Sequence, residues 1–130
     1  MRLSIALAGL VWLVGSGGAT HADELASGAL FASGQNVATC AVTNVGSSPV
    51  GLGNVSIFSS DGSPVSVNFE NCQGVTLAPG RTCNKNANAL SQTLMHSCQV
   101  DTGGATGARF RGTMTIYDTA SKILGTTDLR

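Results

Sequence analysis

The chain has 130 residues, equal numbers of acidic and basic side chains, and 11% charged residues. Its length is that of a single domain. A neutral chain without clustered Lys and Arg is poorly suited to bind nucleic acid or an anionic membrane surface, since both require a basic patch. Val, Leu, Ile and Phe recur in alternating runs among many Gly, Ser, Thr and Asn residues, which indicates a folded β protein rather than a disordered chain.

Residues 1–22 are predicted to be a secretory signal peptide. Arg2 supplies a short basic start, residues 3–14 form an uncharged apolar run, and residues 15–22 are small and polar up to a cleavage site before Asp23. The apolar run is too short to span about 30 Å of hydrocarbon, so no membrane span is expected after cleavage. Loss of Arg2 with the leader gives the mature chain a net charge of −1.

Residues 23–35 are predicted to be an N-terminal extension that precedes one β domain at residues 36–130. Within the extension, residues 25–31 (from Leu25 to Phe31) fit either a weak helical turn or an edge strand. Gly28 and Gly34 weaken both forms. The sequence therefore leaves the structure of this stretch open.

After Asn36, apolar and polar residues alternate in short runs that are separated by turn residues, a pattern that predicts β-strands. The strands expected are residues 37–43, 50–58, 65–69, 75–77, 94–100, 110–117 and 123–129. In residues 81–90, Asn alternates with Lys and Ala, which predicts an edge or irregular segment in which only small residues are buried.

For two of these strands, the alternation predicts which side chains point toward the core and which point toward solvent. In residues 65–69, the apolar side chains Val65, Val67 and Phe69 are expected to point inward and Glu70 outward. In residues 110–117, we expect an inward face and an outward face. The inward residues are Phe110, Met114 and Ile116, and the outward residues are Arg111, Thr113, Thr115 and Tyr117.

The four cysteines are Cys40, Cys72, Cys83 and Cys98. An even number in an exported chain predicts two disulfides, and the absence of any Cys-x-x-Cys pair disfavours zinc. Four cysteines allow three connectivities. We favour a local Cys72–Cys83 bond around a type II turn at Pro79-Gly80, which leaves Cys40–Cys98 to join an early strand to a late one.

About seven short strands with frequent turn signals, and no amphipathic helix, predict an all-β fold. The architecture expected is a single antiparallel two-sheet immunoglobulin-like sandwich with two disulfides.

Four short elements carry a resemblance to a known group of proteins. They read CAVTN at 40–44, LAPGRTC at 77–83, HSC at 96–98 and FRGTM at 110–114. They resemble small secreted bacterial proteins of immunoglobulin-like sandwich type, in which a Leu-Ala-Pro-Gly-x-x-Cys turn joins two strands. The resemblance covers most of residues 37–130 and implies a periplasmic or extracellular structural or interaction module. The core tryptophan of antibody domains is absent from the mature chain.

The sequence contains no complete catalytic set. His96 is the only histidine left after cleavage, and Cys98 beside it is expected to be oxidised. The Asp residues lie at turns, where they bind backbone N–H groups. Met95, His96 and Met114 are reminiscent of a copper site, but methionines are more typical of core and edge packing. We therefore expect no catalytic residue, no metal and no cofactor.

Arg109, Arg111 and Tyr117 are the predicted interaction surface, since Arg and Tyr are favoured at interfaces. The expected function is that of a non-enzymatic binding or structural module, periplasmic or secreted. Its partner would be another protein or a cell-envelope component, bound through a sheet face or an exposed edge strand. Two alternatives stay open: a fimbrial or assembly subunit that donates residues 25–31 as a strand, and a small secreted hydrolase.

Overall fold

The structure is a computed structural model in which residues 24–32, 36–88, 90–105 and 109–130 are described. These residues form strands and turns but no α-helix, so the fold is all-β, as predicted. The predicted signal peptide at residues 1–22 lies outside the described residues. None of the described residues forms a helix that is long and apolar enough to cross a membrane.

Eleven strands are present in the described residues. They are β1 (Glu24–Ala26), β2 (Leu30–Phe31), β3 (Asn36–Asn44), β4 (Val50–Gly51), β5 (Val55–Ser59), β6 (Val67–Glu70), β7 (Thr76–Leu77), β8 (Thr82–Ala87), β9 (Met95–Asp101), β10 (Phe110–Asp118) and β11 (Ile123–Leu129). The number exceeds the prediction of about seven strands for two reasons. β1, β2 and β8 form in stretches that the sequence left open or irregular, and the predicted strand at residues 50–58 is divided into β4 and β5.

The strands form antiparallel sheets of four, five and two strands. In the four-stranded sheet, β1 and β2 follow one another along one edge of β9, and β5 pairs with the other edge. The five-stranded sheet has the order β11-β10-β3-β8-β6, and β4 pairs with β7. Residues 24–31, for which the sequence left a helical turn or an edge strand open, are therefore strands of the four-stranded sheet.

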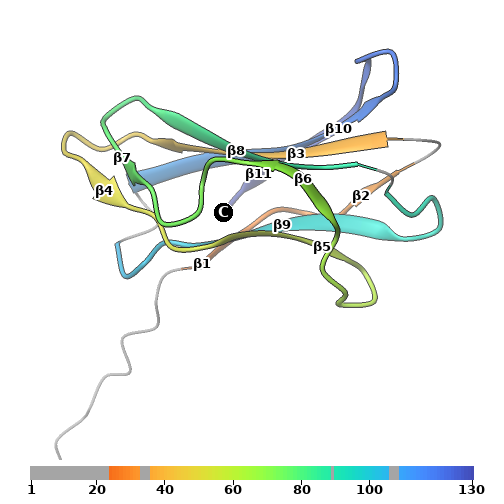
Figure 1. The fold of residues 1–130 in the computed structure, drawn as a ribbon, viewed down its shortest axis with the longest axis horizontal. Coiled ribbons are helices and arrows are strands. Elements are labelled where there is room, and N and C mark those ends of the chain that lie inside the picture. The colour runs from red at the N-terminus through yellow and green to blue at the C-terminus, as the bar shows by residue number, and fades with distance from the viewer. Residues whose placement is uncertain (1–23, 33–35, 89, 106–108) are drawn as a thin grey trace, which may run out of the picture.

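The core lies between the four-stranded and five-stranded sheets, which face each other (Figure 1). Strand β3 alternates strictly between buried and half-buried residues because one of its faces points at the opposite sheet. The inward face predicted for β10 is confirmed, since Phe110, Met114 and Ile116 are at most 1% exposed.

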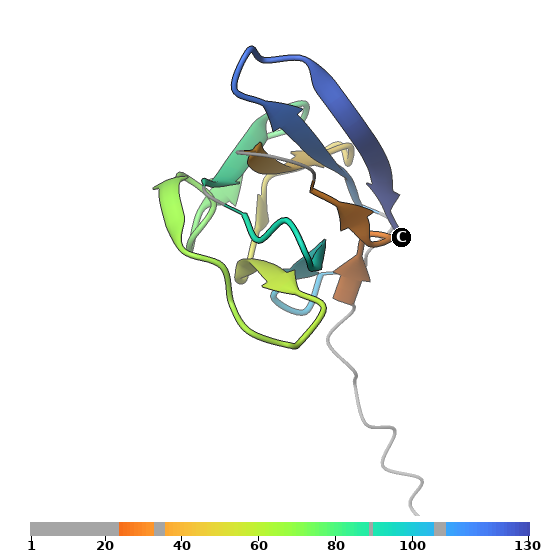
Figure 2. The same cartoon turned by 90° about the vertical axis from the view of Figure 1, so that its right-hand side faces the viewer.

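The two sheets also meet at both of their margins, as the end-on view shows (Figure 2). At one margin, the backbones of Ala26 and Arg130 exchange two hydrogen bonds of 3.0 and 3.1 Å, which link β1 to the end of β11. At the other margin, the Val65 N–H donates to the Ile57 carbonyl (3.0 Å) before the chain continues into β6. These links occupy backbone groups that a strand added from outside would need.

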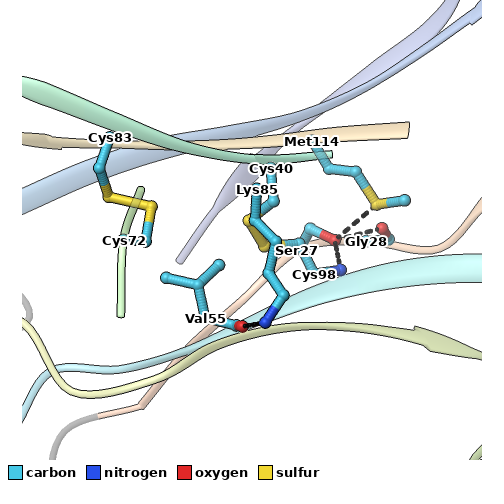
Figure 3. Close-up of a disulfide and its surroundings, with 9 residues drawn as sticks. All are labelled: Ser27, Gly28, Cys40, Val55, Cys72, Cys83, Lys85, Cys98 and Met114. Atoms are coloured by element: carbon cyan, nitrogen blue, oxygen red, sulfur yellow. Dashed lines mark hydrogen bonds between the residues drawn. A yellow bond between two sulfur atoms is a disulfide. The ribbon is translucent and has the colours of Figure 1, made fainter. Parts of the chain in front are cut away.

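Two disulfides are present, as predicted, and no described cysteine is free. Cys40 of β3 is bonded to Cys98 of β9 across the core, and Cys72 to Cys83 of β8 (Figure 3). This is the pairing that the cysteine spacing favoured, and the Cα–Cα separations of 6.0 and 5.1 Å lie in the usual range. Gly80 has a φ of 72°, which a type II turn requires at that position.

The predicted face of β6 is wrong. Val67 and Phe69 are 41% and 48% exposed, and Glu70 is half-buried. For Phe69 and Glu70 the cause is a bulge between Val67 and Phe69, which uses one extra residue and reverses the alternation. After the bulge, Phe69 lies opposite the outward-facing Asn86 and Glu70 opposite the inward-facing Lys85.

The prediction for residues 81–90 is also corrected. Strand β8 is regular and lies between β3 and β6, so it is not an edge strand. Its buried residues are Cys83, Lys85 and Ala87, so the inward face is not confined to small residues. Pairing on both sides outweighs the poor strand propensity of Asn, which depends strongly on context.

Candidate functional site

A hollow of about 600 Å³ lies beside Arg111, where β10 and β11 approach β1. Its polar lining consists of Thr43, Arg111, Thr113, Asp128 and Arg130. Phe110 and Leu129 also border the hollow, but their side chains point into the core and are only 1% and 4% exposed, and Leu25 is half-buried. A volume of this size is in the range of small-ligand sites, about 300–1,000 Å³.

The strand registers bring these residues together. Arg111 lies opposite Thr43 of β3, and Thr113 lies opposite Asp128 of β11. Between them, Gly112 lets the strands approach closely, because a Cβ there would lie 2.8 Å from the Ala41 carbonyl oxygen and 3.1 Å from the Leu129 side chain. The outward face of β10 thus forms one wall of the hollow.

The charged groups of the hollow are not paired with one another. Arg111 donates from Nη1 to the Phe110 carbonyl oxygen (2.9 Å). Within the part of the chain that the structure describes, the one ion pair joins Lys85 to Glu70, so neither arginine of the hollow lies within 4.0 Å of the Asp128 carboxylate. Two guanidinium groups and one carboxylate are thus available to a ligand.

The three residues of the predicted interaction surface do not form one patch. Arg111 lines the hollow. Arg109 lies just before β10 and donates from Nη2 to the Ser48 carbonyl oxygen (2.9 Å), which ties it to the turn after β3. Tyr117 is half-buried near the far end of β10, six residues and about 20 Å from Arg111.

Ser59 and His96 form a contact that the sequence did not indicate. The Ser59 Oγ lies 3.3 Å from His96 Nδ1, and His96 Nε2 lies 3.0 Å from the Ser91 carbonyl oxygen. Because a carbonyl only accepts, Nε2 carries the proton and Nδ1 accepts from the serine hydroxyl. This is the order of nucleophile, base and orienting group found in hydrolases. However, Ser59 is 9% and His96 1% exposed, so the contact serves to join β5 to β9.

Lys85 crosses the core from β8 to the four-stranded sheet (Figure 3). Its ammonium group donates to the Val55 carbonyl oxygen (2.5 Å) and lies 3.2 Å from Glu70 Oε2. The side chains of Lys85 and Glu70 are 11% and 21% exposed, and Glu70 Oε1 has no partner. The three groups fasten β8 to both β5 and β6.

The methionines that are reminiscent of a copper site point in different directions. Met95 is 42% exposed, whereas Met114 is fully buried and lies 3.5 Å from the Ser27 hydroxyl (Figure 3). Residues 24–32, 36–88, 90–105 and 109–130 contain no group of three or more His, Cys, Asp and Glu side chains arranged to hold a metal ion.

No protein-family model, no curated protein and no solved structure matches this chain.

Proposed function

We propose that the mature chain is a non-enzymatic binding module of the periplasm or the extracellular space. It acts through the outer face of the five-stranded sheet, at the hollow beside Arg111. The two facing antiparallel sheets and their central disulfide support an assignment to the immunoglobulin-like sandwiches, and two disulfides are typical of oxidising compartments.

The observation that carries this proposal is the hollow itself. It brings together two arginines, one carboxylate and two threonine side chains, and the charged groups form no ion pair with one another. A sheet face is favoured over an edge because the two margins described above are linked by backbone hydrogen bonds. A hydrolase built on Ser59 and His96 is disfavoured because both side chains are buried.

The test is capture of a partner by the immobilised mature protein from the envelope fraction and culture fluid of the native host. Arg111→Gln is expected to lower the captured amount at least about tenfold, since charge-assisted contacts at a binding site are worth about 1.5–3 kcal/mol. The matched control Lys122→Gln changes an exposed cation at the other end of β11 and should bind as the wild type does. Equal capture by all three proteins would contradict the proposal, as would substrate turnover that depends on His96.

A second candidate is an assembly subunit that exchanges residues 25–31 with a neighbouring copy. In its favour, this segment is held by few backbone contacts. β1 and β2 form three and two residue pairs with β9, Ser27 donates from its N–H to the Cys98 carbonyl oxygen, and the link to β11 consists of the Ala26–Arg130 hydrogen bonds and the Ser27–Leu129 bridge. Its removal would expose the core residues against which Leu25 and Leu30 pack, so a second copy of the strand would be needed to cover them.

Light scattering at rising protein concentration tests this second candidate. Strand exchange predicts that the wild type forms oligomers, whereas the oxidised variant Ala26→Cys/Gln99→Cys stays monomeric because the two residues are opposite each other in the β1–β9 ladder. The matched variant Ala26→Ser/Gln99→Ser should oligomerise like the wild type. A wild type that is monomeric at every concentration would exclude strand exchange.

A further inference from the structure

The hollow beside Arg111 places two like charges opposite each other. In the β10–β11 ladder, Gly112 is opposite Leu129, so the same register puts Arg111 opposite Arg130. Both side chains are exposed, and both alternate onto the outer face of the five-stranded sheet. Side chains in such a cross-strand pair have Cβ atoms about 4.5–5.5 Å apart, so the two guanidinium charges repel each other. Among the described residues, no ion pair of either arginine relieves this repulsion.

The outer face next to the two arginines is polar. The row of side chains that begins with the arginines continues across the sheet through Thr43 and Thr82, whose hydroxyl groups share a hydrogen bond of 2.7 Å. This row spans four strands, which is about 14 Å at about 4.8 Å per strand. The next row on the same face consists of small or polar side chains, namely Asp128, Thr113, Ala41 and Asn84. In these two rows, a ligand therefore meets no large apolar side chain.

The four-stranded sheet, which faces the five-stranded sheet (Figure 1), carries the opposite charge. Glu24 of β1 is opposite Asp101 of β9, and both side chains are exposed. The adjacent pair, Leu25 and Val100, packs into the core, so the two carboxylates lie on the outer face of their sheet. They form no ion pair in the described part of the chain. An anionic ligand is thus repelled by one face of the sandwich and attracted to the arginines on the other.

The polar surroundings distinguish between the anions that two arginines could bind. Guanidinium groups bind carboxylates, sulfates and phosphates through paired hydrogen bonds. The centre of a protein–protein interface is usually apolar and aromatic, and the two rows beside the arginines provide neither kind of side chain. Hydroxyl and amide side chains both donate and accept hydrogen bonds, as the hydroxyl groups of a sugar do. An acidic sugar chain therefore matches both the charge of the arginines and the polar row beside them.

We propose that the hollow and the polar row beside it bind an acidic glycan. The acid group of the glycan lies between Arg111 and Arg130, and the hydroxyl groups of its sugars bond to Thr43, Thr82 and Thr113. This inference rests on the proposed function, and it specifies the ligand class of the same site. A uronic acid and a sulfated sugar both supply the acid group.

The experiment is a titration of the ¹⁵N-labelled purified protein, followed by the amide chemical shifts. Trigalacturonate and sulfated maltotriose are the two acidic probes. The methyl ester of trigalacturonate and unmodified maltotriose keep the sugar without the charge, and triglutamate keeps the charge on a peptide. We expect saturable shifts for the amides of Arg111 to Thr113 and of Asp128 to Arg130 with at least one acidic probe. The neutral sugars should bind at least about tenfold more weakly, and triglutamate at least about fivefold more weakly.

Variants test the contribution of each charge. Arg111→Gln and Arg130→Gln should each weaken binding of the acidic sugar at least about fivefold, whereas Asp128→Asn should tighten it because a repelling carboxylate is removed. Lys122→Gln, which changes an exposed cation at the other end of β11, should leave the affinity unchanged. The acidic probe that binds more tightly identifies the acid group of the natural ligand as a carboxylate or a sulfate.

Four results would overturn the inference. Three of them are the absence of saturable shifts at these amides with both acidic probes, equal affinity for the neutral sugars, and unchanged affinity in Arg111→Gln. The fourth is binding of triglutamate as tight as that of the acidic sugars, which would indicate an acidic peptide instead. If a partner captured from the envelope fraction still requires Arg111 while both acidic sugars fail to bind, the ligand class is wrong and the proposed function stands.

Discussion

Replacing Lys85 with methionine is expected to lower the free energy of unfolding by about 3 kcal/mol. The side chain is buried and has two partners, so its loss leaves the Val55 carbonyl oxygen and the Glu70 carboxylate without their donor. Breaking a buried ion pair by removing one partner costs about 3–5 kcal/mol, and the partial exposure of Glu70 places this case at the lower end. Chemical denaturation of the purified protein measures the change.

The double variant Lys85→Met/Glu70→Gln separates the charge from the packing. Since it removes both charges, it should recover a large part of the loss, because the main penalty in the single variant is an unpaired half-buried carboxylate. Lys122→Met, at an exposed lysine, should change stability by no more than about 0.5 kcal/mol. A Lys85→Met protein as stable as the wild type would show that the ion pair does not fasten β8 to β5 and β6.

The second large effect is expected from the disulfide between the sheets. Cys40→Ala/Cys98→Ala should lower the free energy of unfolding by about 4 kcal/mol, because the bond closes a loop of 58 residues in the unfolded chain. The Cys72–Cys83 bond closes a loop of only 11 residues, so Cys72→Ala/Cys83→Ala should lower the free energy of unfolding by about 3 kcal/mol. Each kcal/mol corresponds to a fall in Tm of about 4 °C or more in a domain of this size.

Thermal and chemical denaturation of the two double-alanine variants, side by side, test this order. The Cys40 and Cys98 side chains are fully buried, so their removal also leaves a gap between β3 and β9 that adds to the loss. A greater loss of stability in the Cys72/Cys83 variant would contradict the view that the bond between the sheets contributes more.

Several features of the fold could be predicted because they depend on neighbouring residues. The alternation of apolar and polar residues in β10 predicted its inward residues, such as Phe110 and Ile116. The Pro79-Gly80 turn between Cys72 and Cys83 favoured a local disulfide, which the structure contains. The bulge in β6 could not be predicted, since it depends on how β6 pairs with β8. The one extra residue in this bulge turns Phe69 outward and Glu70 inward, the opposite of the prediction.

Buried polar contacts were missed because their partners are far apart in the sequence. Lys85 and Val55 are 30 residues apart, and Ser59 and His96 are 37 residues apart. No local pattern connects either pair, so only the antiparallel pairing of β5 with β9 and the packing of β8 against β5 bring them into contact.

The candidate site was predicted in part. Arg111 could be selected because it lies on the polar face of an alternating strand. Its partners Asp128 and Arg130 depend on the register of the β10–β11 hairpin, which a bulge between Ile116 and Tyr117 shifts by one residue. Leu25 joins the site because β1 pairs with β9, an arrangement that its three residues are too short to indicate.

The most direct test of the binding surface is photocrosslinking in the native host, with a photoreactive amino acid at Thr113 in the hollow and, as a control, at the exposed Gln73 in the loop after β6. Binding through the hollow predicts a discrete adduct from position 113 that disappears when Arg111 is also changed to Gln, and no such adduct from position 73. An adduct from position 73 alone, or one from position 113 that persists without Arg111, would contradict it.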